Sequence, residues 1–236
     1  MCDFARELLL IDKPAGITSF DVIRRLRRVY RVRHPDSRPP KMGHAGTLDP
    51  LATGLMLIGV GQGTKQLARL TKLDKEYVAV VRVGEQRSTG DLEGEVVATT
   101  PVTATCATLT PDIEAVLATM VGEVALPVPA YSAIKQGGVP LYKRARAAAA
   151  RGVTLPVAPH RIMRVQAATL LACTPVGTCL DITVRFSVGS GTYIRSLAEA
   201  LGRRLSYPAT LASLRRTRVG EYRIADADTL PEIPVQ

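Results

Sequence analysis

The sequence predicts an α+β fold built on a central, mixed but mainly antiparallel sheet flanked by helices. Residues 180–188 alternate apolar and polar side chains, which is the pattern of a strand with one buried face. Strand-like and helix-like segments do not alternate strictly along the chain, which disfavours a doubly wound parallel sheet. The 236 residues, 46% of them hydrophobic, are enough for one large domain or two small ones with a substantial core.

The N-terminal third predicts a strand followed by a basic helix. Residues 8–11 are a short apolar run that ends in a turn, which predicts a strand. Thr18-x-x-Asp21 is typical of a capping box at a helix start, with Asp in place of the usual Glu. Apolar residues then recur at helical spacing while four arginines occupy the opposite side, so we expect an amphipathic helix with a basic face. The apolar positions are Val22, Ile23, Leu26, Val29 and Tyr30.

The elements after this helix follow from proline, glycine and β-branched residues. Three prolines in residues 33–41 predict a loop. We then expect a buried strand, a short helix and two further strands, at residues 55–60, 65–73, 77–83 and 94–99. Thr110-Pro111 is typical of a helix start and predicts a helix to about residue 121. A long strand and a last helix are expected at residues 161–174 and 192–205.

The basic residues of the chain are concentrated in three segments. The net charge of +10 suggests a polyanionic partner. Residues 21–41, 141–164 and 203–223 together carry +17, and the remainder carries −7. Folded together, these segments would form one groove for a phosphate backbone. The alternative is three separately solvated basic faces.

Several classes of protein and site are disfavoured. No apolar run reaches the ~18 residues of a membrane span, and the N-terminus lacks the apolar core of a secretory signal. Four scattered cysteines without C-x-x-C spacing and three histidines predict neither a zinc site nor a disulfide framework, and favour the cytoplasm. No P-loop, G-x-S-x-G or H-E-x-x-H motif is present. Gly59-x-Gly61-x-Gly63 predicts a strand-to-helix turn, because it lacks the spacing of a dinucleotide site.

Residues 43–54, GHAGTLDPLATG, form the strongest candidate for a functional loop. Glycines and a proline bracket one carboxylate, Asp49, and loops specified this tightly often present functional side chains on a rigid scaffold. Two interpretations remain open for Asp49: a catalytic residue, or a turn residue stabilised by Pro50. For His44 considered alone, a hydrogen-bonded structural histidine is the simpler interpretation.

This loop, together with further segments in the same order, resembles the TruB branch of the pseudouridine synthases. The further segments are DKPxGxTS at 12–19, KxY at 75–77, STGDxxG at 88–94, PAYSAIK at 129–135, LYxxAR at 141–146, GTYIRSL at 191–197 and LRRT at 214–217. Each segment alone is moderately specific, and their common order makes coincidence negligible.

The resemblance implies the pseudouridine synthase catalytic fold, with an RNA-binding cleft, and a reaction. The reaction converts uridine to pseudouridine in the T loop of tRNA, at tRNA position 55. It cleaves the N-glycosidic bond, rotates the uracil and rejoins it through carbon, without cofactor or metal. The implied partner is tRNA, bound through its T stem-loop by a cytoplasmic monomer that does not use a membrane.

The resemblance also assigns residues. Asp49 is implied to be the essential catalytic aspartate, and Arg195 to pair with it. Tyr77 is implied to stack on the target base and later to assist proton removal. His44 takes the place left by the flipped nucleotide. Further substrate or RNA contacts are expected at Lys13, Tyr131, Lys135, Tyr193 and Leu197.

These roles are physically consistent with one another. Flipping a base out of its stack costs a few kcal/mol, and stacking on an aromatic side chain recovers roughly 1–3 kcal/mol. A carboxylate in a water-excluding cleft has a raised pKa, and a charge-assisted bond from arginine opposes that rise and fixes the rotamer. Arginine suits this task because its planar guanidinium stays charged.

Alternatives remain open at particular residues. Tyr77 opens an apolar strand and, without the motif, is a core aromatic. Arg195 lies on an otherwise apolar helix, so it needs a carboxylate partner on either interpretation. Asp91 and Lys135 are expected to be structural or RNA-contacting rather than catalytic. The sequence also leaves open whether Asp49 is a nucleophile or a base. Two other function classes are a non-catalytic RNA-binding protein and a guide-RNA-directed synthase on the same scaffold.

The chain also departs from the family pattern. We expect a single catalytic domain over residues 1–236, without the small C-terminal RNA-binding, PUA-like domain that bacterial members commonly carry. Residues 206–210 replace a turn that is usually rich in glycine, and residues 31–41 form a longer, more proline-rich connection than expected.

Overall fold

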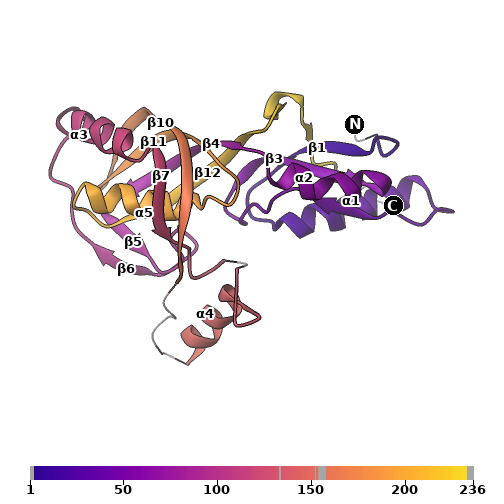
Figure 1. Cartoon of the computed structure of the whole chain (residues 1–236), viewed down its shortest axis with the longest axis horizontal. Coiled ribbons are helices and arrows are strands. Elements are labelled where there is room, and N and C mark those ends of the chain that lie inside the picture. Colours follow the sequence, from indigo (N-terminus) through magenta and orange to yellow (C-terminus); the bar gives the residue numbers. More distant parts are fainter. Residues whose placement is uncertain (1–2, 133, 152, 154–157, 233–236) are drawn as a thin grey trace. The chain divides into compact units, whose positions relative to one another are not determined.

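The chain folds into two compact units. A computed structural model describes residues 3–132, 134–151, 153 and 158–232. The first unit comprises Met1–Val78 and Leu214–Gln236, and the second comprises Ala79–Ser213. The chain passes between the units within two strands, β4 (Lys75–Val83) and β12 (Ala209–Val219) (Figure 1). Ala133, within the predicted motif at residues 129–135, lies outside the described residues.

The first unit contains a mixed sheet in the order β14-β1-β3-β12. β3 pairs with β1 in antiparallel fashion along one edge, from Leu8↔Gly59 to Lys13↔Gly54. Its other edge pairs first with β2 and then, in parallel, with β12 at Thr53 and Gly54. The strands are β1 (Leu8–Lys13), β2 (Met42–His44), β3 (Thr53–Val60), β13 (Tyr222–Arg223) and β14 (Asp228–Thr229). The helices are α1 (Ser19–Arg33), η1 (Gly61–Gln66), α2 (Leu67–Thr71) and η2 (Ile224–Asp226).

Helix α1 begins as the sequence predicts. Thr18 is the N-cap: its hydroxyl accepts from the amide of Asp21, and the Asp21 carboxylate accepts from the amide of Thr18 at 2.9 Å. This reciprocal capping satisfies two amides that a helix start leaves without partners. The buried face of α1 consists of Ser19, Val22, Ile23, Leu26 and Val29. The predicted amphipathic helix is therefore confirmed, and its arginines are left on the outward side.

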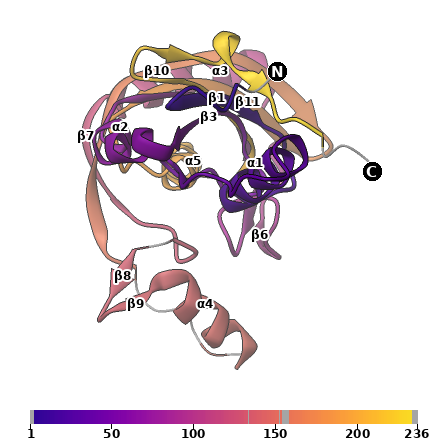
Figure 2. The ribbon, with the colours of Figure 1, turned by 90° about the vertical axis from the view of Figure 1, so that its right-hand side faces the viewer.

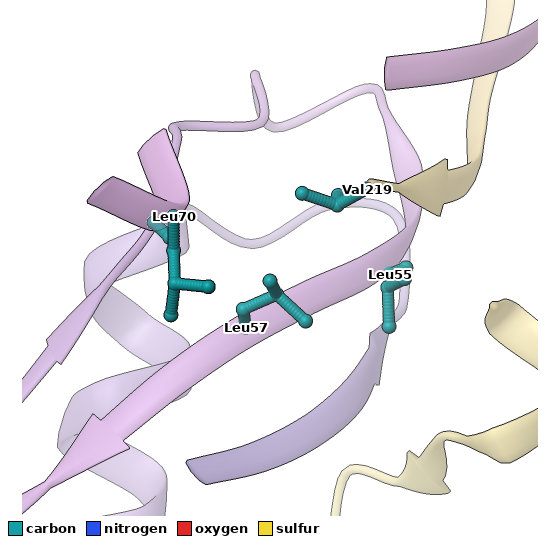
Figure 3. Close-up of a cluster of buried hydrophobic side chains, with 5 residues drawn as sticks. Leu55, Leu57, Leu70 and Val219 are labelled. Carbon is teal, nitrogen blue, oxygen red and sulfur yellow. The ribbon is translucent and has the colours of Figure 1, made fainter. Parts of the chain in front are cut away.

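The core of the first unit lies under the candidate loop. Leu55 and Leu57 of β3 pack with Leu70 of α2, Val219 of β12 and Ala45 of the loop (Figure 3). All five are fully buried, so β3 is fixed by apolar contacts as well as by strand pairing. The loop at residues 45–52 thus starts from a rigid base.

The second unit contains a sheet in the order β4-β11-β10-β7 with helices packed against it. The alternation at residues 180–188 is confirmed, because buried and less buried side chains alternate along β11. α3 packs against β10, and α5 packs against β7. The elements are β5 (Glu85–Arg87), β6 (Val96–Thr99), α3 (Cys106–Thr119), β7 (Gly122–Pro127), β8 (Lys135–Gln136), β9 (Val139–Pro140), α4 (Leu141–Ala150), β10 (His160–Val176), β11 (Cys179–Val188) and α5 (Ile194–Arg204). In Figures 1 and 2, α4 and the β8–β9 hairpin project away from the sheet of this unit.

One prediction about an individual element was wrong, and two further elements are shorter than expected. α3 begins at Cys106, not at residue 110, because Thr105 and Thr108 cap it reciprocally, and Pro111 lies inside the helix. The short helix expected at residues 65–73 is a 3₁₀ segment followed by the one-turn α2. The strand expected at residues 94–99 is limited to Val96–Thr99. No helix in the described ranges is long and apolar enough to cross a membrane.

Candidate functional site

The loop that carries Asp49 connects β2 to β3, which pair with each other in antiparallel fashion. The amide of Ala45 donates to the carbonyl of Leu57 just after β2 ends, and the loop ends where β3 begins, at Thr53. Within the loop, the amide of Ala52 donates to the carbonyl of Asp49 at 3.1 Å. Asp49 itself is half-buried. The carboxylate therefore lies on a short, tightly bonded turn.

The start of α1 holds this loop through Ser19. The buried Ser19 hydroxyl accepts from the amide of Leu48 at 2.8 Å and donates to the Leu48 carbonyl at 2.9 Å. Both bonds are made to the residue directly before Asp49. The position of Asp49 thus depends on the capping box that fixes where α1 begins.

Lys13 connects the turn after β1 to the same loop. Its side chain has no exposed surface, and Nζ donates to the carbonyls of Pro14, Ile17 and Pro50 at 2.9, 2.7 and 3.2 Å. These bonds satisfy a buried ammonium group and give Lys13 an internal role. The expected contact of Lys13 with RNA therefore lacks support in this geometry.

Arg216, from β12, lies beneath the loop with its side chain almost fully buried. Its Nε donates to the carbonyl of Leu55 at 2.7 Å, and Nη2 donates to the carbonyl of Gly46 at 3.2 Å. Gly54 has a φ of 107°, and a Cβ there would lie 2.3 Å from the carbonyl oxygen of Arg216. Glycine is therefore required at the end of the loop, for both its conformation and its close approach to β12.

A second buried cation, Lys75, lies near Arg216. Its Nζ donates to the carbonyls of Thr71 and Leu73 at 2.5 and 2.6 Å. Burial lowers the pKa of Lys75 to about 8, and the charge of Arg216 acts in the same direction. Two cationic groups thus underlie the loop of Asp49, and such a field favours anions over the loop.

His44 lies at the end of β2, opposite Ile58 of β3. Burial lowers the pKa of His44 below its ordinary value, and the charge of Arg216 adds to this effect. The imidazole is therefore neutral at neutral pH. Its Nδ1 is buried and makes no hydrogen bond within the described part of the chain. This leaves one polar atom of a neutral ring without a partner among the described residues, and the expected role at a displaced nucleotide stays a prediction.

Tyr77 lies on β4, on the same face as Lys75, with 8% of its surface exposed. An aromatic ring this buried fits the packing interpretation, and it stacks on a base only where one face of the ring is accessible. Its place in the first unit, two residues after Lys75, agrees with the motif. The stacking role stays a prediction.

In the second unit, Arg195 is held by neighbours from two segments. Nη1 donates to the carbonyl of Thr89 at 2.8 Å, and Nη2 donates to the carbonyl of Tyr131 at 3.1 Å. Nη1 also lies 3.8 Å from Oδ2 of Asp91. The expected carboxylate near this buried arginine is thus present. Asp49 belongs to the other unit, and its pairing with Arg195 stays a prediction.

The remaining expected contacts differ in exposure. Lys135 is exposed on β8, and Tyr131 and Tyr193 are half-buried, so all three side chains have surface for a ligand. Leu197 has no exposed surface and lies on the buried face of α5, so its expected contact with RNA lacks support in this geometry. No group of side chains in the described ranges has the composition of a metal site.

The sequence motifs include Arg216 and Lys75 but gave them no specific role, and Asp91 was expected to be structural or RNA-contacting. Asp91 is fixed by the hydroxyl of Thr89 at 2.5 Å and by the amide of Glu93 at 3.2 Å. Glu199 was not singled out at all; burial raises its pKa, and Arg203 and Arg195 oppose the rise. The sequence contained one signal for these residues: each is a charged side chain in a segment whose apolar pattern otherwise predicts burial.

Comparisons with known proteins agree on one family. A family model described as TruB family pseudouridylate synthase (N terminal domain) matches residues 27–194. Two relatives, both named tRNA pseudouridine synthase B, come from Mycobacterium sp. (strain KMS) and Mycobacteroides abscessus. They are 41% and 43% identical to this chain over 231 and 227 residues. The alignments cover 96% of this chain in both cases, and 72% and 71% of the relatives.

The fold also occurs in solved structures. A chain in the crystal structure of a Cbf5–Nop10–Gar1 complex superposes with a TM-score of 0.65 at 24% identity. The superposition covers 97% of this chain and 55% of that chain. A chain of an archaeal box H/ACA sRNP Nop10–Cbf5 complex gives a TM-score of 0.62 at 25% identity, with coverages of 94% and 51%. The chain thus spans about half the length of these solved relatives, and the expected pseudouridine synthase fold is confirmed.

Proposed function

The chain belongs to the TruB family of pseudouridylate synthases, and on that premise we propose that it converts uridine to pseudouridine in tRNA. The finer proposal is that the target is in the T loop, at tRNA position 55, as the sequence motifs imply. The observation that carries the proposed isomerase activity is the loop at residues 43–54, which presents one carboxylate from a turn held by Ser19 and Arg216. A non-catalytic binding protein has no need to hold an aspartate so firmly in front of phosphate-rich RNA.

The proposed reaction needs no oxidant, reductant or cofactor. The bond between N1 of uracil and the sugar breaks, the ring turns, and a carbon of the ring bonds to the same sugar carbon. The proton displaced from that ring carbon leaves, and N1 gains one, so the product is an isomer of the substrate. Asp49 acts as an ionised carboxylate, either by attacking the sugar or by taking a proton from it.

The remaining residues prepare this chemistry in the proposal. Tyr77 stacks on the extruded uracil, and Arg195 pairs with the catalytic carboxylate and keeps it ionised. His44, whose neutral ring has one polar atom without a partner among the described residues, lies where the extruded nucleotide leaves its place. The proposed partner is tRNA and the proposed setting is the cytoplasm, with the protein acting as a monomer.

One assay tests the proposal. An unmodified tRNA transcript is incubated with the protein, and pseudouridine is located by nuclease digestion and mass spectrometry after a pseudouridine-specific label. A transcript with cytidine at the target position serves as the substrate control, and Asp49→Asn serves as the protein control. We expect one pseudouridine in the T loop, made only from the uridine transcript and only by the unaltered protein.

Each other outcome removes a defined part of the proposal. Product at another site refutes the T-loop target but keeps the isomerase. Turnover by Asp49→Asn removes Asp49 from its role. Binding of tRNA without turnover by the unaltered protein favours the RNA-binding protein that the sequence left open.

A further inference from the structure

The second half of α1 and the loop that follows it enclose a basic pocket in the first unit. The pocket has a volume of about 360 Å³. Its lining consists of Arg27, Arg31, Arg38, Pro39, Pro40 and Lys41. Arg27 is half-buried, and the other three cationic side chains are exposed. Four cations and no carboxylate thus line one cavity, which gives it a strongly positive potential.

Three other arginines of α1 have partners within the structure, and the cations of this pocket differ from them. Arg24 pairs with Asp21, Arg25 donates to the carbonyl of Pro231 at 2.7 Å, and Arg33 lies over the ring of Phe4. By contrast, the head groups of the pocket make no hydrogen bond or ion pair within the part of the chain that the structure describes. Like charges gathered without a counter-charge repel one another, and a bound anion removes that repulsion.

We propose that this pocket binds the sugar–phosphate backbone of the RNA substrate, at a nucleotide away from the modified uridine. Arg27 and Arg31 are one helical turn apart, so their guanidinium groups lie on one side of α1. Such forks match phosphate oxygens in pairs, and Lys41 adds a compact charge from the loop that follows α1. The rings of Pro39 and Pro40 supply a half-buried apolar wall that fits the face of a ribose.

The position of the pocket connects it to the candidate loop. Lys41 directly precedes β2, which ends at His44. Three residues of strand span about 10 Å, so an RNA strand lying over β2 reaches from the pocket to the loop of Asp49 within a few nucleotides. The pocket is thus suited to hold the backbone beside the nucleotide that is extruded. This inference rests on the proposed function for the identity of the RNA, but not for the binding itself.

An acidic protein partner is the main alternative occupant. Protein interfaces place large apolar or aromatic anchors at their centre. The lining of this pocket has no such anchor, and its only apolar parts are two proline rings. A chain with regularly spaced, charged phosphate groups and sugar faces fits this lining better than a peptide does.

The test is RNA binding by two independent double variants of the full chain. Arg27→Gln/Arg31→Gln removes the helix side of the pocket, and Arg38→Gln/Lys41→Gln removes the loop side. Arg28→Gln/Lys72→Gln is the matched control, since it removes the same charge from exposed residues outside the pocket. Affinity for a fluorescent T stem-loop RNA is measured by anisotropy over a series of salt concentrations, and circular dichroism confirms folding.

We expect each pocket variant to bind at least ~10-fold more weakly than the control. The slope of log K against log salt should fall in magnitude by about 0.7–0.9 for each phosphate that the variant no longer neutralises. Equal affinity and equal slope in the control and both pocket variants would overturn the inference. The inference would also be overturned if an acidic peptide of matched charge displaced the labelled RNA as effectively as unlabelled RNA does.

This measurement separates the pocket from the proposed function. If the unaltered protein made no pseudouridine while the pocket variants failed to bind RNA, the isomerase proposal would fail and the pocket would stand. If the unaltered protein made pseudouridine and the pocket variants bound RNA as the control does, the isomerase proposal would stand and the pocket proposal would fail.

Discussion

Nη1 of Arg195 lies 3.8 Å from Oδ2 of Asp91, and both side chains are almost fully buried, with 7% and 4% of their surfaces exposed. The distance is longer than a hydrogen bond, and the strong bonds of the guanidinium go to the carbonyls of Thr89 and Tyr131. Asp91 therefore serves mainly as the counter-charge of an arginine that backbone carbonyls hold in place. The guanidinium has its position before any RNA arrives, so little reorganisation is needed on binding.

Replacing Asp91 by Asn should destabilise the protein by about 3 kcal/mol, since it leaves the buried Arg195 with one counter-charge fewer. The check is urea unfolding at neutral pH. Glu123→Gln, an exposed acid of the same unit, is the control and should change stability by no more than about 0.5 kcal/mol. Equal stability of the two variants would mean that the carbonyl bonds alone hold Arg195.

Tyr77→Phe should keep RNA affinity within about threefold, because the ring that stacks on the base is retained. Product formation should fall by roughly 10²-fold if the hydroxyl assists proton removal. Single-turnover pseudouridine formation and anisotropy binding measure the two effects separately. Unchanged turnover would deny the hydroxyl a role and leave Tyr77 as a packing and stacking residue.

The buried Lys75 should make stability depend on alkaline pH. Its pKa is lowered from 10.5 in the unfolded chain to about 8 in the folded protein, mainly by burial. Between these values the unfolded chain binds more protons than the folded one, so stability rises as pH rises from about 8 to 10.5. The gain should lie between about 1 and 3 kcal/mol.

Denaturant unfolding over this pH window checks the prediction. Lys75→Met should lack the gain, whereas Lys72→Met, which alters an exposed neighbour, should retain it. If stability still rises with pH in Lys75→Met, the rise must come from the titration of other groups, and the argument from the burial of Lys75 would be wrong.

Gly54→Ala should cost at least ~3 kcal/mol, because strain at positive φ adds to the collision with the Arg216 carbonyl. Gly61→Ala is a matched control: its φ is also positive, at 55°, but a Cβ there meets nothing within 4 Å. It should cost about 1–2 kcal/mol. Thermal unfolding of both variants gives the comparison, and similar decreases in stability would show that conformational strain alone determines the effect.

Local signals in the sequence predicted those elements that depend on neighbouring residues. The capping of α1 by Thr18 and Asp21, and the alternation along β11, need no information from distant segments. The start of α3 was predicted wrongly because Thr110-Pro111 is the commoner helix-start pattern, whereas the cap is Thr105 with Thr108. In each case the bounds or the buried face of the element are determined by side chains within one helical turn or one strand.

The strand β12 was not predicted, because Arg215, Arg216 and Arg218 break the apolar pattern. Arg216 is nevertheless buried, since carbonyls of Leu55 and Gly46 satisfy its guanidinium. A buried charge of this kind depends on partners far away in the chain, and periodicity within one segment does not encode it. The motifs identified Asp49, but the residues that hold its loop emerged only from the three-dimensional contacts.

The bond from Arg216 to Leu55 joins residues 161 positions apart. During synthesis the loop of Asp49 therefore leaves the ribosome long before the strand that supports it. At 5–20 residues per second, the wait is roughly 8–32 seconds. Until β12 emerges, β3 lacks its strand partner at Thr53 and Gly54, and the loop lacks its bond from Arg216. The segment that carries the candidate catalytic aspartate is thus among the last parts of the nascent chain to reach its native conformation.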